Sequence, residues 1–89
     1  MKTLLIADLN SIGFLKKYRK RLELLGFKII VPRYFDDMIL LAMAEAYNGF
    51  VVTFDTDFLG YDRAIVLPKK KWEVCVTFLI KELVKKLGR

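Results

Sequence analysis

Four short, mostly apolar runs constrain the fold of this chain more than any other feature. They span residues 3–7, 27–31, 50–54 and 64–67, and glycine, proline or aspartate bounds each of them. Runs of this length without a strict apolar–polar alternation are typical of strands that are covered on both faces, as in parallel sheets. We therefore predict four largely buried strands.

Helical periodicity fills the intervals between these runs. Apolar residues recur at helical spacing over 14–25, with Ser11 as a candidate N-cap and Gly26 as the stop, and again over 38–47. A last stripe comprises Trp72, Cys75, Val76, Leu79, Ile80, Leu83 and Leu87. This alternation predicts one domain over residues 1–89 with an α/β fold in three layers, α/β/α.

The connections predict the order of the strands. The alternation of strands and helices implies a mostly parallel four-stranded sheet with right-handed crossovers, for which we expect the order 2-1-3-4. In that order strand 1 touches strand 3, and the chain reverses its winding direction between them. Doubly wound sheets bind ligands at this switch point, beyond the carboxyl ends of the strands.

Composition and charge exclude several classes of protein. The chain is 55% hydrophobic, which excludes disorder, and no apolar run approaches the ~18 residues of a membrane span. Asp8 interrupts the apolar start and no small-residue cleavage site follows it, so we expect a cytoplasmic protein with no membrane partner. Abundant lysine and the absence of glutamine resemble the composition of heat-adapted proteins.

Histidine is absent from the sequence, and Cys75 is the single cysteine. These counts exclude a disulfide within the chain, catalytic dyads that need histidine, and metal sites with histidine ligands. Polar chemistry must therefore come from carboxylates, lysines or a metal held by oxygen. The net charge is +6, and basic domains often bind nucleic acid.

Aspartates follow the strands whose ends meet at the predicted switch point. They are Asp8 after strand 1, Asp37 at the start of the helix after strand 2, and Asp55 and Asp57 after strand 3. Parallel strands bring all four to one edge of the sheet. Each alone is a common cap or turn residue, but together they indicate a site. Asp36 fits a helix cap and Asp62 fits a turn.

Clustered carboxylates are costly without a cation. Two like charges about 4 Å apart repel by about 4 kcal/mol at a surface-like dielectric. Oxygen ligands without histidine or cysteine favour Mg²⁺ or Mn²⁺, and such an ion polarises a phosphoryl oxygen and lowers the pKa of a bound water. The four aspartates therefore predict a metal site suited to phosphodiester hydrolysis.

Three short motifs coincide with these predicted elements. They are Asp8-x-Asn10 after the first strand, Asp37 with Leu40, Leu41 and Ala44 in the second helix, and Thr53-x-Asp55-x-Asp57-Phe58 after the third strand. Over most of residues 3–67 this pattern resembles the compact PIN-like (PilT N-terminal-like) nuclease domains, a group similar to the toxins of bacterial and archaeal toxin–antitoxin pairs.

The resemblance implies a metal-dependent endoribonuclease. Its catalytic residues, which would ligate one or two Mg²⁺ or Mn²⁺ ions, would be Asp8, Asp37, Asp55 and Asp57. Asn10 would orient substrate or water, and the hydroxyl of Thr53 would support the metal ligands. The implied partners are single-stranded RNA and an antitoxin protein.

The chain departs from the PIN-like pattern at two places. Leu9 stands where the group often has Glu, and the outer face of the second helix carries Met38, Ile39 and Ala42 where the group has acids. An apolar outer face indicates a contact surface, so we expect a homodimer or another bound partner there. The alternative is that this helix is buried more deeply.

Two other functions are compatible with the sequence. A receiver-like phospho-acceptor would place an aspartate after its third strand, as Asp55 is placed, but it also needs a lysine after a fifth strand, which this pattern lacks. The other is a PIN-like remnant that binds a partner or nucleic acid without catalysis.

Basic and aromatic residues are further candidates for nucleic-acid contacts. The basic residues of the first helix form either a solvated face or a phosphate contact, and the lysine run 69–71 is a second candidate for such a contact. Stacking on bases is open to Tyr34, Phe35, Phe58 and Tyr61, although Phe58 fits the core better. Trp72 and Cys75 fit the apolar stripe of the last helix, and we assign them no chemistry.

Overall fold

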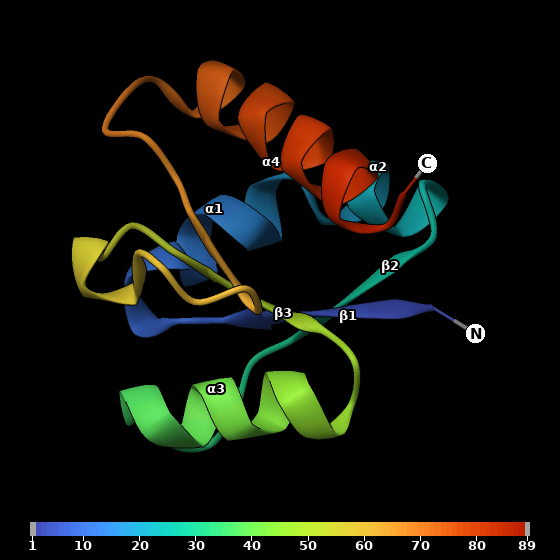
Figure 1. Cartoon of the computed structure of the whole chain (residues 1–89). Helices are drawn as coiled ribbons and strands as arrows, with labels where there is room; N and C mark the ends of the chain where they lie inside the picture. The colour runs from blue at the N-terminus through green and yellow to red at the C-terminus, as the bar shows by residue number, and fades with distance from the viewer. Residues whose placement is uncertain (1, 89) are drawn as a thin grey trace.

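Strands and helices alternate along the chain in the computed structural model, which describes residues 2–88 (Figure 1). The elements in chain order are β1 (Thr3–Ala7), the 3₁₀ turn η1 (Leu9–Ser11), α1 (Ile12–Lys17), α2 (Arg19–Leu24), β2 (Phe27–Ile30), α3 (Asp37–Ala46), β3 (Phe50–Thr53), the 3₁₀ turn η2 (Thr56–Phe58), β4 (Ala64–Val66) and α4 (Trp72–Lys86).

The four strands form one parallel sheet in the order β2-β1-β3-β4, which confirms the predicted order. Leu5 on β1 pairs with Ile29 on β2 and with Phe50 on β3, and Val52 on β3 pairs with Ile65 on β4. Because every strand runs in the same direction, all carboxyl ends meet at one side of the sheet, here called the C-terminal edge.

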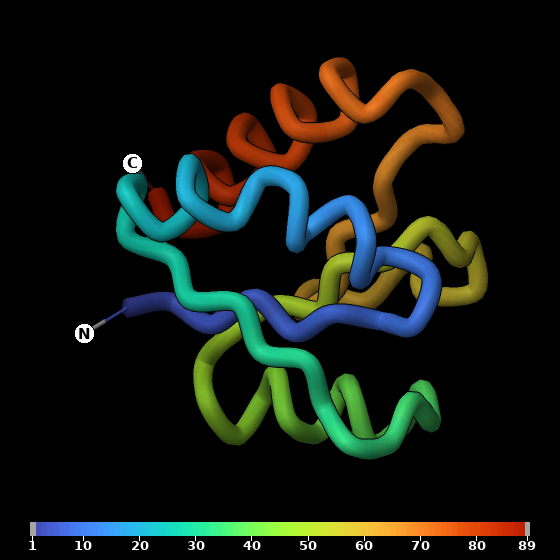
Figure 2. Tube along the Cα trace, turned by 180° about the vertical axis from the view of Figure 1, so that it is seen from behind, coloured from blue at the N-terminus to red at the C-terminus, as the bar shows by residue number. Residues whose placement is uncertain are grey.

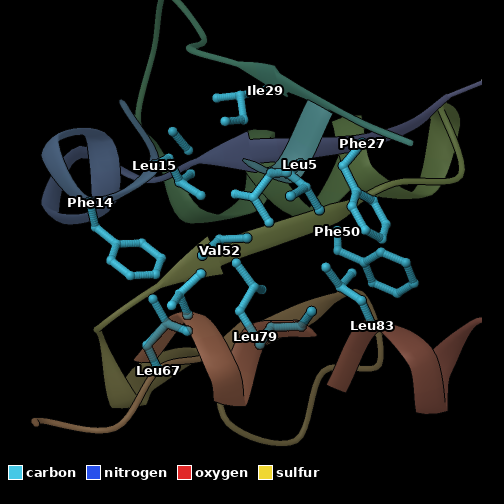
Figure 3. Close-up of a cluster of buried hydrophobic side chains, with 14 of the residues drawn as sticks. Leu5, Phe14, Leu15, Phe27, Ile29, Phe50, Val52, Leu67, Leu79 and Leu83 are labelled. Carbon is cyan, nitrogen blue, oxygen red and sulfur yellow. The ribbon is translucent and has the colours of Figure 1, made fainter. Parts of the chain in front are cut away.

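Alternate strand residues divide the interior into two cores, one on each face of the sheet. The helices α1, α2 and α4 cover one face, and both views show α3 alone on the other (Figures 1 and 2). Leu5, Val52 and Leu79 belong to the first core (Figure 3), whereas Ile6 and Leu40 belong to the second. The central strand β3 is therefore buried on both faces, whereas Lys28 on the edge strand β2 is exposed. The predicted three layers are confirmed.

A close backbone approach fixes how α3 returns to the sheet. Gly49 is buried at the start of β3, and a Cβ atom added there would lie 2.6 Å from the carbonyl oxygen of Leu4. Any larger residue would push β3 away from β1, because real Cβ atoms do not approach a carbonyl oxygen so closely. Glycine at this position thus lets β1 and β3 lie side by side at the switch point.

The first helix differs from the prediction. The expected helix over 14–25 is divided at Tyr18, whose backbone has φ −102° and ψ 15°, and whose ring packs on that of Phe14 at 5.3 Å between centroids. Ser11 does not cap the helix with its side chain. Its buried hydroxyl instead donates at 2.6 Å to the carbonyl oxygen of Val52, which pairs with Ala7 where the pairing of β1 and β3 ends.

Two apolar positions are more exposed than a buried helix face would allow. On the outer face of α3, Met38 is 66% exposed and Ile39 is 45% exposed, so the idea that this helix is buried more deeply is wrong. The homodimer or other bound partner that we expected on this face stays a prediction, as does the antitoxin protein. Trp72 is 40% exposed, although Cys75 in the same predicted stripe is fully buried.

Within residues 2–88, no helix combines the length and the hydropathy needed to cross a bilayer.

Candidate metal centre

Three of the four predicted acids converge at the C-terminal edge. Asp37 is the first residue of α3, Asp55 directly precedes η2, and Asp57 lies within η2. One carboxylate oxygen of each lies within 4.8 Å of the others. We call these residues the acidic trio. They come from two segments far apart in sequence, which the parallel sheet and the packing of α3 bring together.

Local hydrogen bonds hold the segments that carry the trio. Asp55 accepts a hydrogen bond at 2.9 Å from the backbone N–H of Asp57 through its Oδ1 atom, which closes the turn after β3. Asp36 caps α3 by accepting bonds from the N–H groups of Met38 and Ile39 at 3.0 and 3.3 Å. The prediction that Asp36 is a cap is thus confirmed, and Asp37 occupies the first helical turn beside it.

Asp8 lies near the trio but is not part of it. Its side chain is buried, and both of its oxygens already accept hydrogen bonds from the chain. Oδ1 accepts from the N–H of Leu9 at 2.8 Å, and Oδ2 accepts from the hydroxyl of Thr53 at 2.7 Å. The structure therefore places Asp8 as a buried acid at the end of β1, whereas the trio is exposed or half-exposed.

Thr53 and Asn10 connect the ends of β1 and β3. The hydroxyl of Thr53 donates to Asp8 and accepts from the N–H of Asp55 at 3.0 Å. The side-chain oxygen of Asn10 accepts from the N–H of Phe54 at 3.1 Å. These bonds fix the exit of β3, and hence the position of Asp55, relative to β1. A contact of Asn10 with substrate or water stays a prediction.

Crowding raises the pKa of the Asp37 carboxyl. Loss of hydration at its position is the largest cause, followed by the negative charges of Asp55, Asp8, Asp57 and Asp36. The Asp37 side chain is nevertheless exposed. Of the two causes of the raised pKa, a bound cation would reverse the repulsion between the negative charges.

The trio suits a hard divalent cation. Its donors are oxygen atoms only, which Mg²⁺ and Mn²⁺ prefer. Around an octahedral Mg²⁺ ion, neighbouring ligand oxygens lie about 3.0 Å apart, and among three ligands at most one pair lies on opposite sides, about 4.2 Å apart. Oxygens within 4.8 Å of one another would therefore have to move closer together on binding, which rotation of the exposed side chains of Asp37 and Asp57 allows. The remaining positions of an octahedral site would stay open to water or phosphate oxygens.

Replacing Thr53 by Val should lower the free energy of unfolding by about 1–3 kcal/mol, because it leaves the buried Asp8 carboxylate without its hydroxyl donor. The N–H of Asp55 loses its acceptor in the same variant. Urea denaturation measures the change. Thr53→Ser keeps the hydroxyl and should recover most of the lost stability; an equal loss in both variants would show that packing around this side chain, and not the hydrogen bond, sets the stability.

The other predicted aromatic residues divide between core and surface. Phe58 is 1% exposed and belongs to the core under α3, as expected, whereas Tyr34 and Tyr61 are exposed.

Comparison with protein-family models, with curated proteins and with solved structures finds no match to this chain. The resemblance to PIN-like domains therefore stays a prediction, and the metal centre rests on its own geometry.

Proposed function

We propose that this chain is a divalent-metal-dependent nuclease that hydrolyses phosphodiester bonds in RNA, as the PIN-like pattern of its sequence implies. The main support is the acidic trio at the switch point of a parallel sheet. Three carboxylate oxygens within 4.8 Å of one another are electrostatically unfavourable alone and favourable around a cation. The site is open at the surface, where a polymer chain has access to it.

In this proposal, some residues bind the cation, and others keep the strand ends that carry these ligands in position. Asp37, Asp55 and Asp57 would ligate Mg²⁺ or Mn²⁺, which polarises a phosphoryl oxygen and lowers the pKa of a bound water when present. Asp8 adds negative charge behind the trio, and its bond from Thr53 keeps the ends of β1 and β3 in register. Each Asp8 oxygen retains a second lone pair, so ligation by Asp8 remains part of the proposal.

The direct test is cleavage of single-stranded RNA by the purified chain. We expect cleavage of a labelled oligonucleotide with Mn²⁺ or Mg²⁺, and none after addition of EDTA. An RNA that stays intact with both metals over a range of protein concentrations would contradict the proposal.

A non-catalytic binding module is the second candidate. The observation in its favour is that both oxygens of Asp8 already accept hydrogen bonds from the chain, so this acid is less free to bind metal than the trio. A metal that raises the melting temperature without any cleavage of RNA would favour this module over the nuclease.

A further inference from the structure

An exposed tryptophan lies at the same end of the molecule as the acidic trio. Trp72 begins α4 and is 40% exposed, unlike Cys75, Val76, Leu79 and Leu83, the buried residues of the same stripe. Its ring meets the ring of Phe14 edge-on, with centroids 5.9 Å apart and an interplanar angle of 80°. Phe14 thus supports the indole from one side while a large part of its surface stays open to solvent.

One lysine lies over this indole, and three more precede it in the sequence. The ammonium group of Lys17 lies over the Trp72 ring, 5.8 Å from its centroid. The three residues that precede Trp72 are Lys69, Lys70 and Lys71, and all three are exposed. Glu73 is the nearest acid in the sequence, but it lines a separate hollow on the neighbouring face of α4 with Thr77 and Lys81. We call Trp72, Lys17 and Lys69–Lys71 the basic aromatic surface.

This surface is connected to the metal centre by one aromatic side chain. Phe14 packs on Trp72 and also on Phe54, again edge-on at 5.9 Å between centroids. Phe54 directly precedes Asp55 of the trio. Both views place the segment before α4, the loop after β3 and the start of α3 at one end of the sheet (Figures 1 and 2).

The pairing of an open indole with lysines matches the chemistry of a single nucleic-acid strand. Bases of an unpaired strand stack on aromatic faces, while the phosphates between them are neutralised by lysines. A polyanion without bases would gain nothing from the indole, and bases in a duplex are already stacked. Lys17 could leave the indole face to a base and contact the neighbouring phosphate without moving its helix.

The geometry points to the basic aromatic surface as a binding site for single-stranded nucleic acid, which carries the strand over the C-terminal edge toward the acidic trio. A base stacks on Trp72, and Lys17 and Lys69–Lys71 contact the adjacent phosphates. This inference rests on the proposed function insofar as it names the substrate, but strand binding does not require metal and is measurable alone.

The test uses the full chain in EDTA, so that no cleavage occurs. Trp72 is the only tryptophan, and stacking of a base should quench its fluorescence when oligouridylate or oligothymidylate of about 12 nucleotides, within the usual site sizes for single strands, is added. In a parallel measurement of fluorescence anisotropy with a labelled strand, Trp72→Ala should bind about 5- to 100-fold more weakly. Trp72→Phe keeps a ring on Phe14 and should retain most of the affinity. Quenching by either strand supports the inference, and the two arms show which sugar is preferred.

Lysine variants supply the matched controls. Replacing Lys70 and Lys71 by Ala should weaken binding and reduce the slope of log affinity against log salt by roughly 0.7 for each phosphate that is no longer neutralised. Lys2 is an exposed lysine just before β1, at the opposite end of the sheet, and Lys2→Ala should bind normally. A strand without bases should bind weakly and leave the fluorescence unchanged.

Several results would overturn the inference. These are binding without quenching, equal affinity of Trp72→Ala and the unaltered chain, equal affinity for a strand without bases, or tighter binding of polyglutamate than of the oligonucleotide. Cleavage with Mn²⁺ but no quenching would contradict strand binding at this surface and support the nuclease. Quenching in EDTA but no cleavage with metal would contradict the nuclease and support strand binding at this surface.

Discussion

Asp37→Asn is expected to lower Mn²⁺-dependent cleavage of single-stranded RNA at least about 100-fold, because even residues that only support a metal ligand cost about 10- to 100-fold when replaced. The carboxamide keeps the shape of the side chain and removes the charge that the cation needs. The rate of cleavage of a labelled oligonucleotide measures the effect, and circular dichroism shows that the variant is folded.

Asp36→Asn is the matched control for this experiment. Asp36 and Asp37 are adjacent, so both variants lose one negative charge at the start of the same helix. Asn caps a helix about as well as Asp, and the cap bonds to Met38 and Ile39 need only an acceptor oxygen. We expect cleavage close to that of the unaltered chain. A loss as large as that of Asp37→Asn would mean that the overall charge of the helix start, and not a ligand, is responsible.

Asp55→Asn should cause a loss as large as that of Asp37→Asn. Its side-chain oxygen can still accept from the N–H of Asp57, so the turn after β3 keeps its shape. Asp8→Asn is less informative, because an amide has one acceptor oxygen where Asp8 uses two, and the variant loses stability as well as charge. Wild-type cleavage rates in both Asp37→Asn and Asp55→Asn would show that the trio is not the site.

Hydrophobic pattern and connection rules predict most of this fold. The apolar runs predicted β1 to β4, and their alternation with helices predicted a parallel sheet for which the expected order was β2-β1-β3-β4. These features depend on burial and on the connections, and hardly on individual side chains. The convergence of Asp37 and Asp55 follows from the same topology, since parallel strands end at one edge.

The hydrophobic pattern could not predict details that depend on individual contacts. Asp8 has the same position in the topology as Asp55, yet the hydroxyl of Thr53 and the N–H of Leu9 hold it in a buried position beside the trio. Trp72 has the spacing of a buried stripe, but it is the first residue of α4, where the helix passes the end of the core and a stripe residue is left partly uncovered. Periodicity shows which face of a helix is apolar, but it does not show where the core that this face packs against ends.

Metal should stabilise the fold more strongly at pH 7 than at pH 4, because the raised pKa of Asp37 leaves this ligand more protonated at the lower pH. At a free concentration about one hundred times its Kd, a cation that binds only the folded chain adds about 2.7 kcal/mol. For a domain of this size that free energy corresponds to a rise in Tm of about 10–20 °C. Differential scanning calorimetry with Mn²⁺ and with EDTA at each pH measures the rise.

The sign of the pH dependence follows from Asp37. Its pKa in the folded chain lies above the ordinary value of 3.8, so the folded state holds more protons than the unfolded state between the two values. In the metal-free protein the stabilising contribution of this group is therefore complete below pH 3.8 and is lost as the pH rises through the raised pKa. Mn²⁺ replaces the proton, so its effect on Tm should grow over the same interval.

Two variants separate this linkage from unspecific binding of Mn²⁺ to the surface. Asp37→Asn removes the repelling charge, so at pH 7 its metal-free Tm should not fall below that of the unaltered chain, and most of the rise with Mn²⁺ should disappear. Asp36→Asn keeps the trio and should keep the rise. If the rise with Mn²⁺ is the same at pH 4 and pH 7, or the same in both variants, the cation binds elsewhere, because a site that includes the Asp37 carboxylate loses affinity when this group is protonated or replaced.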